Sequence, residues 1–140
     1  MADFLLQKGA NINSTDSEGS SLLSYAIMVN NIDFVDFLIR NKVNKTLKAS
    51  NTSMGCFPIH SCESLEMLVK LELEGFDLNL VCDNGMNLLH FSIEENFDDI
   101  SKYLITNNLV NKAQMDKDGL TPLDYAIKYK NQDIQKMLKS

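Results

Sequence analysis

The sequence lacks the features that mark membrane, secreted or nucleic-acid-binding proteins. No apolar run approaches the roughly 20 residues that a membrane-spanning helix needs. The first residues, MADFLLQKGANIN, carry neither the basic flank nor the apolar core of a signal peptide. The net charge of −6 disfavours nucleic acid and anionic membrane surfaces, because both select for clustered Lys and Arg. We therefore expect no nucleic-acid partner and no direct membrane binding.

Cysteine is scarce, and its pattern is uninformative about disulfides. The three cysteines are Cys56, Cys62 and Cys82. An odd number at irregular spacing does not suggest a disulfide framework, so a reducing compartment is the default. We expect a cytoplasmic protein, with the nucleus as the alternative location.

Catalytic motifs are also missing. The chain has no Gly-x-Ser-x-Gly elbow, phosphate-binding loop or His-Glu-x-x-His motif. One cluster is suggestive: Cys56, His60 and Cys62 could bind zinc if Cys82 or His90 supplied a fourth ligand. Against this, Cys62 falls at a small apolar helix position, where a cysteine simply packs. We expect no metal, no cofactor and no enzymatic activity.

A repeated unit is present instead. Four glycines, Gly19, Gly55, Gly85 and Gly119, are 36, 30 and 34 residues apart. Each is followed two residues later by a position where Ser, Asn or Thr predominates, then by two residues that are apolar or proline. A second apolar stretch at helical spacing completes each unit. The chain is therefore an array of similar units.

This array resembles the ankyrin repeat. The nearest matches to that family are Gly119-Leu120-Thr121-Pro122-Leu123, Leu88-Leu89-His90, and the stretch from Leu5 to Asn13. The resemblance covers nearly the whole chain. It implies an all-α solenoid of stacked helix-turn-helix units with β-turn or hairpin loops. It implies one domain, 1–140, with a half repeat at 1–15 and repeats at about 16–51, 52–81, 82–115 and 116–140.

Local chemistry agrees with such a unit. Ser21, Asn87 and Thr121 each carry a side-chain oxygen that can cap a helix N-terminus. Gly75 is suited to end a second helix, since glycine adopts the left-handed conformation found there. Helices this short are marginal alone, so each must be buried against its neighbour. We expect Leu89 to lie in that buried stack.

The third repeat departs from the pattern. His60 and Leu65 are three residues closer in sequence than their counterparts His90 and Asp98. Phe57 also lacks an oxygen that could cap a helix. We expect a stunted first helix or a 3₁₀ turn here. This irregularity could be a weak joint or a shaped notch used by a partner.

The two histidines stand where the family's Thr-Pro-Leu-His motif places its histidine. The resemblance implies that His60 and His90 form structural hydrogen bonds between neighbouring repeats. Catalysis or metal ligation is the alternative interpretation.

Ankyrin arrays generally bind other proteins through their concave side, made by the turn tips and first helices. Among the candidate residues, Met28, Val29, Met54, Met86, Leu120 and Tyr129 are apolar at positions expected to face water, which would mark a binding site. The alternative is that some of these side chains pack on their neighbours. The candidate partner-binding residues are Ser17, Ser20, Met28, Val29, Met54, Cys82, Asn84, Met86, Glu94, Glu95, Lys117, Leu120, Lys128 and Tyr129.

The resemblance favours a non-catalytic protein–protein interaction module whose partner the sequence does not identify. Two alternatives remain: a regulatory or targeting segment of a larger enzyme, channel or transferase, and a stand-alone inhibitor that masks a partner. The chain opens inside a repeat, which favours a fragment with an initiator Met over a genuine half repeat. We expect a monomer, with association through the uncapped N-terminal half repeat as the alternative.

Overall fold

The computed structural model describes residues 12–17, 20–47 and 56–139, and the regular elements in this part of the chain are helices. An antiparallel bridge between Thr15 and Ser21 is isolated. The predicted all-α class is therefore confirmed. In chain order, the helix pairs are α2 (Leu22–Met28) with α3 (Ile32–Arg40), the 3₁₀ helix η1 (Pro58–Ser61) with α4 (Leu65–Leu73), α5 (Leu88–Glu94) with α6 (Asp98–Thr106), and α7 (Pro122–Lys128) with α8 (Gln132–Lys139).

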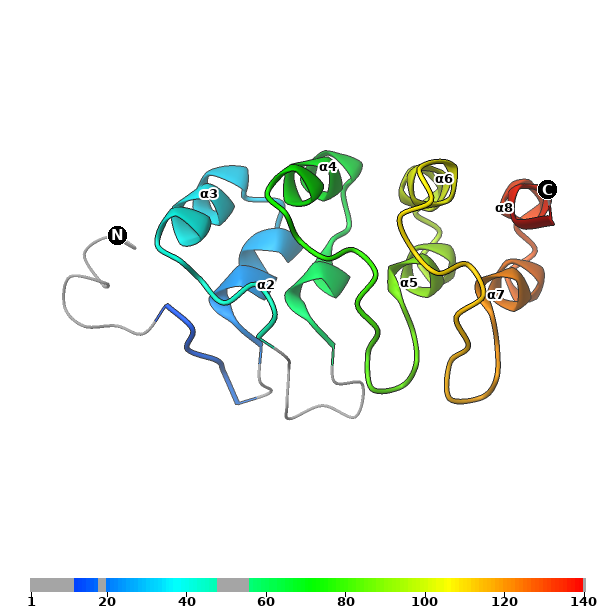
Figure 1. Cartoon of the computed structure of the whole chain (residues 1–140), viewed down its shortest axis with the longest axis horizontal. Helices are drawn as coiled ribbons and strands as arrows, with labels where there is room; N and C mark the ends of the chain where they lie inside the picture. Colours follow the sequence, from blue (N-terminus) through cyan, green and yellow to red (C-terminus); the bar gives the residue numbers. More distant parts are fainter. Residues whose placement is uncertain (1–11, 18–19, 48–55, 140) are drawn as a thin grey trace.

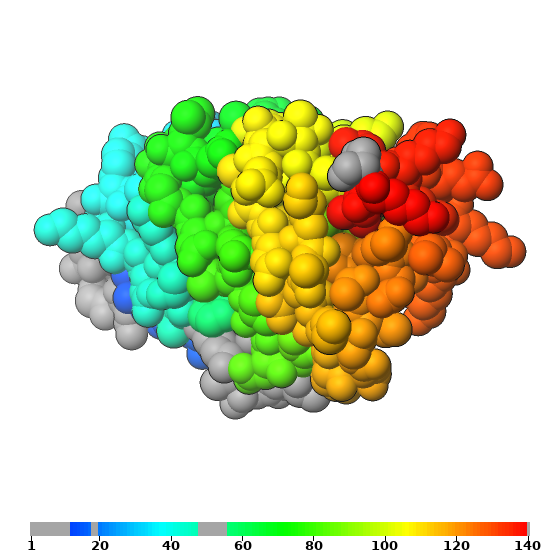
Figure 2. Space-filling view, turned by 45° about the vertical axis from the view of Figure 1, so that its right-hand side comes forward, coloured from blue at the N-terminus to red at the C-terminus, as the bar shows by residue number. Residues whose placement is uncertain are grey.

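The helices form two layers (Figure 1). One layer holds the first helix of each pair, where α2 packs on η1, η1 on α5, and α5 on α7. The other layer holds the second helices, where α4 contacts α6 and α6 contacts α8. The turns that precede α5 and α7 project beyond the first-helix layer (Figure 1). Successive pairs lie directly against each other as adjacent bands in the space-filling view (Figure 2).

Side-chain caps fix where the first helices begin. The oxygens of Ser21, Asn87 and Thr121 accept the backbone N–H three residues further on, at 3.2, 3.1 and 3.3 Å. Each bond satisfies one of the unpaired donors at a helix N-terminus. The predicted caps are confirmed. Phe57, at the same position before η1, forms no side-chain cap.

A continuous apolar core lies within the stack. Leu23, Ile59 and Leu89 occupy the same position in three first helices, and each is at most 1% exposed. Val35, Leu68 and other residues of the second helices meet them from the opposite layer. The expectation that Leu89 is buried is confirmed. Because the core is shared between neighbouring pairs, no pair buries its apolar residues alone.

The third repeat has the shortened first helix that the sequence predicts. η1 is a four-residue 3₁₀ helix, whereas α5 is a seven-residue α-helix. The chain then becomes extended at Cys62 (φ −73°, ψ 122°), and Ser64 caps α4. Gly75 follows α4 with φ +83°, as predicted for a helix stop.

The four helix pairs fall inside the four predicted repeats, but the repeat boundaries themselves stay a prediction. The half repeat at 1–15 lies mostly outside the described residues. Within the described residues, no helix has the length and apolar character to cross a membrane.

Candidate protein-interaction surface

The turns before the first helices are built from a repeated aspartate–tyrosine pair. In the last repeat, the N–H of Asp116 donates to the Leu120 carbonyl at 2.9 Å, and the Tyr125 hydroxyl donates to the Asp116 carboxylate at 2.6 Å. Burial raises the pKa of Asp116, but hydrogen bonds from Tyr125 and from backbone N–H groups outweigh it and lower the pKa overall. Asp16 and Tyr25 form the same pair in the second repeat. The turn tips are thus tied to their helices.

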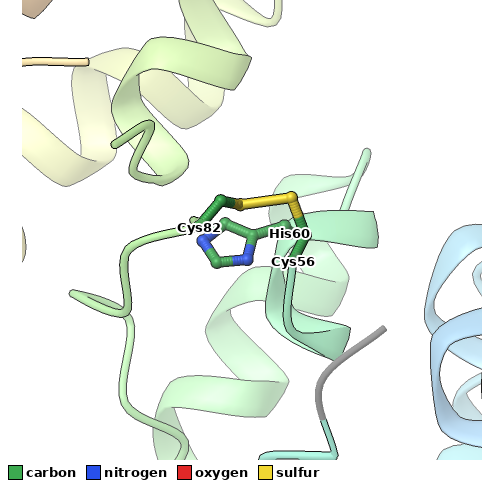
Figure 3. A group of neighbouring side chains, drawn as sticks. All are labelled: Cys56, His60 and Cys82. Carbon is green, nitrogen blue, oxygen red and sulfur yellow. A yellow bond between two sulfur atoms is a disulfide. The ribbon is translucent and has the colours of Figure 1, made fainter. Parts of the chain in front are cut away.

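A disulfide replaces this pair in the fourth repeat. Cys82 stands at the aspartate position, and Phe91 stands where Tyr125 and Tyr25 stand. Cys82 is bonded to Cys56, 26 residues earlier, so the bond ties the turn of the third repeat to that of the fourth (Figure 3). The odd cysteine count gave no signal of this bond. The bond was not expected for a reducing compartment, and the cytoplasmic location stays a prediction.

Cys82 is 3% exposed, so it offers a partner little surface, and its role in partner binding stays a prediction. Its sulfur lies in the disulfide rather than at the surface.

Both histidines form structural hydrogen bonds, His90 to the next repeat and His60 to the end of its own repeat. His60 Nδ1 accepts the Phe57 N–H at 3.0 Å, so Nε2 carries the proton and donates to the Leu80 carbonyl at 3.0 Å. His90 Nδ1 likewise accepts a backbone N–H, and its Nε2 donates to the Leu120 carbonyl at 3.1 Å. Burial lowers the pKa of both rings, so each stays neutral at pH 7. The inter-repeat hydrogen bond implied by the family resemblance is confirmed for His90, whereas the bond of His60 stays within the third repeat.

The suspected metal ligands are only partly brought together. Cys56, His60 and Cys82 present ligand atoms within 4.8 Å of one another (Figure 3). The two sulfurs are bonded to each other, and both ring nitrogens are engaged in hydrogen bonds. Cys62 stands outside this group, and its buried thiol donates to the Ser64 carbonyl at 3.2 Å. In the disulfide state this cluster offers no open ligand set.

Cys62 is also poorly suited to nucleophilic chemistry. Burial raises the pKa of its thiol to about 11, with smaller contributions from the negative charges of Glu63 and Asp99. A catalytic cysteine needs the opposite, a thiolate stabilised at neutral pH.

The apolar candidates divide into exposed and buried side chains. Met28 and Val29 are 43% and 65% exposed, and Tyr129 is exposed too, as predicted. Met86 is only 6% exposed and belongs to the core, so the expectation that it faces water is wrong. Leu120 is half-buried against that core. In both cases the turn folds onto the helices and covers the side chain. Met54 lies outside the described residues.

The polar candidates mostly face water. Ser20 and Asn84 are half-buried. Asn84 has a structural role, because its carbonyl accepts the Lys117 N–H from the next turn at 2.8 Å. The exposed polar candidates are Ser17, Glu94, Glu95, Lys117 and Lys128.

Sequence reasoning missed three exposed apolar residues on the first helices, Leu22, Tyr25 and Ile127. Leu22 and Ile127 stand at positions that are buried in other repeats, as Leu88 and Ile93 are, so they are exposed at the ends of the described stack. Tyr25 did offer a signal, because it lies four residues before Val29 and is offset from the buried Leu23 and Ile27. This spacing predicts a face that the stack itself does not cover.

Two hollows flank the shortened helix. One, of about 220 Å³, lies between α2 and η1 and is lined by residues including Ser20 and Tyr25. The other, of about 260 Å³, lies between η1 and α5 and is lined by residues including Phe91 and Glu95. Met28 and Ser61 border both hollows. The missing helical turn of the third repeat has therefore left open space rather than a collapsed joint.

Comparison with known proteins agrees with this architecture. Residues 59–140 match a family model described as ankyrin repeats (3 copies), and residues 1–39 match one described as ankyrin repeats (many copies). The chain belongs to the ankyrin-repeat family. This protein is 32% identical over 126 residues to FPV223 of fowlpox virus (strain NVSL), named as an ankyrin repeat protein, across 89% of this chain and 86% of the relative.

Two other fowlpox virus proteins named as ankyrin repeat proteins are also similar. FPV022 is 26% identical over 93% of this chain, and FPV034 is 27% identical over 82%. The matches span 22% and 28% of those two relatives. Ankyrin repeats generally mediate protein–protein interaction, and this general function applies to the family to which the chain belongs.

Proposed function

We propose that this chain is a non-catalytic module that binds another protein through its first-helix face. This face is the exposed side of α2, η1, α5 and α7 together with the turns before them, and it is the side expected to be concave.

One observation carries the proposal. Exposed apolar side chains gather on this face at equivalent positions of two repeats, because Val29 directly follows α2 and Tyr129 directly follows α7. Among the described residues of the second helices, Leu73 at the end of α4 is the only large apolar side chain that is similarly exposed. Exposed apolar residues concentrated on one side of a protein typically mark an interaction site. The members on the first-helix face are Tyr25, Met28, Val29 and Tyr129.

The arrangement suits recognition rather than catalysis. His60 and His90 are neutral and tied to backbone carbonyls, and Cys62 has a raised pKa. No observation on the described residues favours a regulatory segment of a larger enzyme or a masking inhibitor over the general module.

A binding experiment tests the proposal. The tagged chain is used to capture a partner from cell extract, beside a variant carrying Val29→Asp, Lys128→Asp and Tyr129→Asp. Leu73→Asp, on the second-helix layer, is the matched control because Leu73 is 80% exposed. Capture should be lost in the triple variant and kept in the control. Circular dichroism checks that all variants fold, and unchanged capture by a folded triple variant contradicts the proposal.

A further inference from the structure

The hollow between η1 and α5 is the most distinctive feature of the first-helix face. We call it the notch and define it by Met28, Cys62, Glu63, Phe91, Glu95 and Phe97, which line it together with neighbouring residues. In the regular repeat, the last turn of α5 contributes Ile93 to the buried stack. η1 lacks that turn, so α2 and α5 face one another across the gap.

The interior of the notch is apolar and chemically inert. Phe91 and Phe97 are half-buried, and Met28 is 43% exposed. The ring of His60 lies 5.5 Å from that of Phe91, with both its nitrogens already hydrogen-bonded. Cys62 keeps its proton and bonds a carbonyl. The interior therefore offers contact area and no reactive group.

The rim carries negative charge. Glu63 and Glu95 line the notch and are exposed, and Glu94 stands beside Glu95. The ion pairs found among the described residues involve Lys70 on the other layer, and none reaches these glutamates. Both carboxylates are available to a basic partner. Charged rims of this kind steer and orient an incoming segment of opposite charge.

The volume of the notch favours a protein side chain over a small molecule as its occupant. The notch holds about 260 Å³ and is open to solvent, whereas small-molecule pockets usually range from about 300 to 1,000 Å³ and enclose most of the ligand. A single apolar side chain projecting from a protein surface fits within this volume. Met28 favours such a guest, because methionine adapts its shape to what it contacts.

We propose that the notch receives one apolar side chain, of the size of Leu or Met, from a partner protein segment in which Lys or Arg flanks that residue. This inference rests on the proposed function, because it specifies the kind of partner that the first-helix face binds. The apolar side chain would fill the gap left by the missing helical turn, and the flanking cations would pair with Glu63 and Glu95.

A defined peptide series tests this proposal without knowledge of the natural partner. The probe is a fluorescein-labelled peptide, Gly-Ser-Arg-Arg-Leu-Arg-Arg-Ser-Gly. One companion peptide carries Ser in place of the central Leu, and another carries Glu in place of every Arg. The Leu peptide should bind at least tenfold more tightly than either companion and should shift the ¹³C-methyl resonance of Met28. Equal binding of the Leu and Ser peptides, or no Met28 shift, overturns the proposal.

Charge reversal supplies the matched control. The variant Glu63→Lys with Glu95→Lys should weaken the Arg-Leu peptide at least tenfold. Asp33→Lys with Glu66→Lys makes the same change in net charge at exposed positions of α3 and α4, and should weaken it less than threefold. Equal loss in both variants shows general attraction between opposite charges and overturns the notch as a specific site. Ser61→Phe, which fills the border of the notch, should abolish the preference for Leu over Ser.

The proposal of the first-helix face and the proposal of the notch can be contradicted independently. The triple aspartate variant of the first-helix face leaves every residue that defines the notch unchanged. If the triple variant loses the partner while the peptides show no preference for Leu, the proposal of the interaction face is supported and the proposal of the notch is overturned. If the peptides bind as expected while the triple variant still captures its partner, the broader face is wrong and the notch stands.

Discussion

The stack contains two kinds of joint. At the regular joint, α5 and α7 are full seven-residue helices, and His90 of α5 reaches the Leu120 carbonyl of the next turn. At the abbreviated joint, the four-residue η1 lies between α2 and α5, and His60 bonds the Leu80 carbonyl at the end of its own repeat instead. The histidine bond therefore crosses the regular joint but not the abbreviated one.

The two joints differ in what holds the turns together. At the regular joint, the turn of α5 approaches the turn of α7 through backbone, where the Lys117 N–H donates to the Asn84 carbonyl at 2.8 Å. At the abbreviated joint, the Cys56–Cys82 disulfide links the two turns covalently. The comparison teaches that a repeat can lose a helical turn and stay in register if other bonds span the gap. The space so released becomes the notch.

The largest expected effect contrasts equivalent core residues in the two joints. Leu89→Ala should lower the free energy of unfolding by about 2–5 kcal/mol, because it removes a fully buried side chain from a rigid site. Ile59→Ala, at the same position of η1, should lower the free energy of unfolding by less, because the shorter helix can relax around the cavity. Urea melts measure both, with exposed Val29→Ala expected within about 0.5 kcal/mol of the parent. An equal or larger loss at Ile59 would show that the abbreviated joint is no softer.

Reducing the disulfide should have the next largest effect. A bond spanning 26 residues stabilises a fold by about 3 kcal/mol through restriction of the unfolded chain. A dithiol reductant should therefore lower the urea midpoint, and Cys56→Ser with Cys82→Ser should lower it equally and remove the response to reductant. The oxidised chain should weigh two hydrogens less than the reduced chain by intact mass spectrometry. Identical masses would show that the bond does not form.

Two turn glycines give a matched pair for the regular joint. Gly119 has φ +79° and open space where a Cβ would lie, so Gly119→Ala should cost only the backbone strain of about 1 kcal/mol. Gly85 has φ +84°, and a Cβ there would lie 2.7 Å from the Cα of Asp116. Gly85→Ala should therefore cost more, because backbone of the next turn must move. Thermal unfolding measures both, and equal losses would contradict the close approach of the turns.

The smallest expected effect is a mild loss of stability in weak acid. Burial lowers the pKa of His60 and His90 below 6.5, whereas the unfolded chain protonates near 6.5. The unfolded state then binds more protons, so stability is fully present above pH 6.5 and falls as the pH drops toward the folded-state values. NMR titration of the two ring resonances should give midpoints below 6.5. A midpoint at or above 6.5 would mean that burial does not hold the ring neutral.

The regular features of the fold could be predicted because they repeat. The caps at Ser21, Asn87 and Thr121 and the stop at Gly75 depend on local chemistry that the sequence shows directly. The shortened helix was also visible, because a missing turn changes the distance between recurring residues.

Features that depend on contacts between repeats were harder to predict. Met86 looked exposed by position, yet its turn folds onto the core. Cys82 looked like a surface residue, and only the approach of two turns shows that it meets Cys56. Likewise, spacing predicted that a helix would be short, but it could not show whether the gap would collapse or stay open as the notch.

The conformation of residues 57–64 tests the central claim most directly, because the notch exists only if the first helix of the third repeat is truncated. Backbone ¹³C chemical shifts of the isotope-labelled chain report it residue by residue. The account predicts a single helical turn at Pro58–Ser61, followed by extended shifts at Cys62 and Ser64. Helical shifts continuing through Cys62 to Ser64 would mean that the missing turn is restored, and would contradict the account.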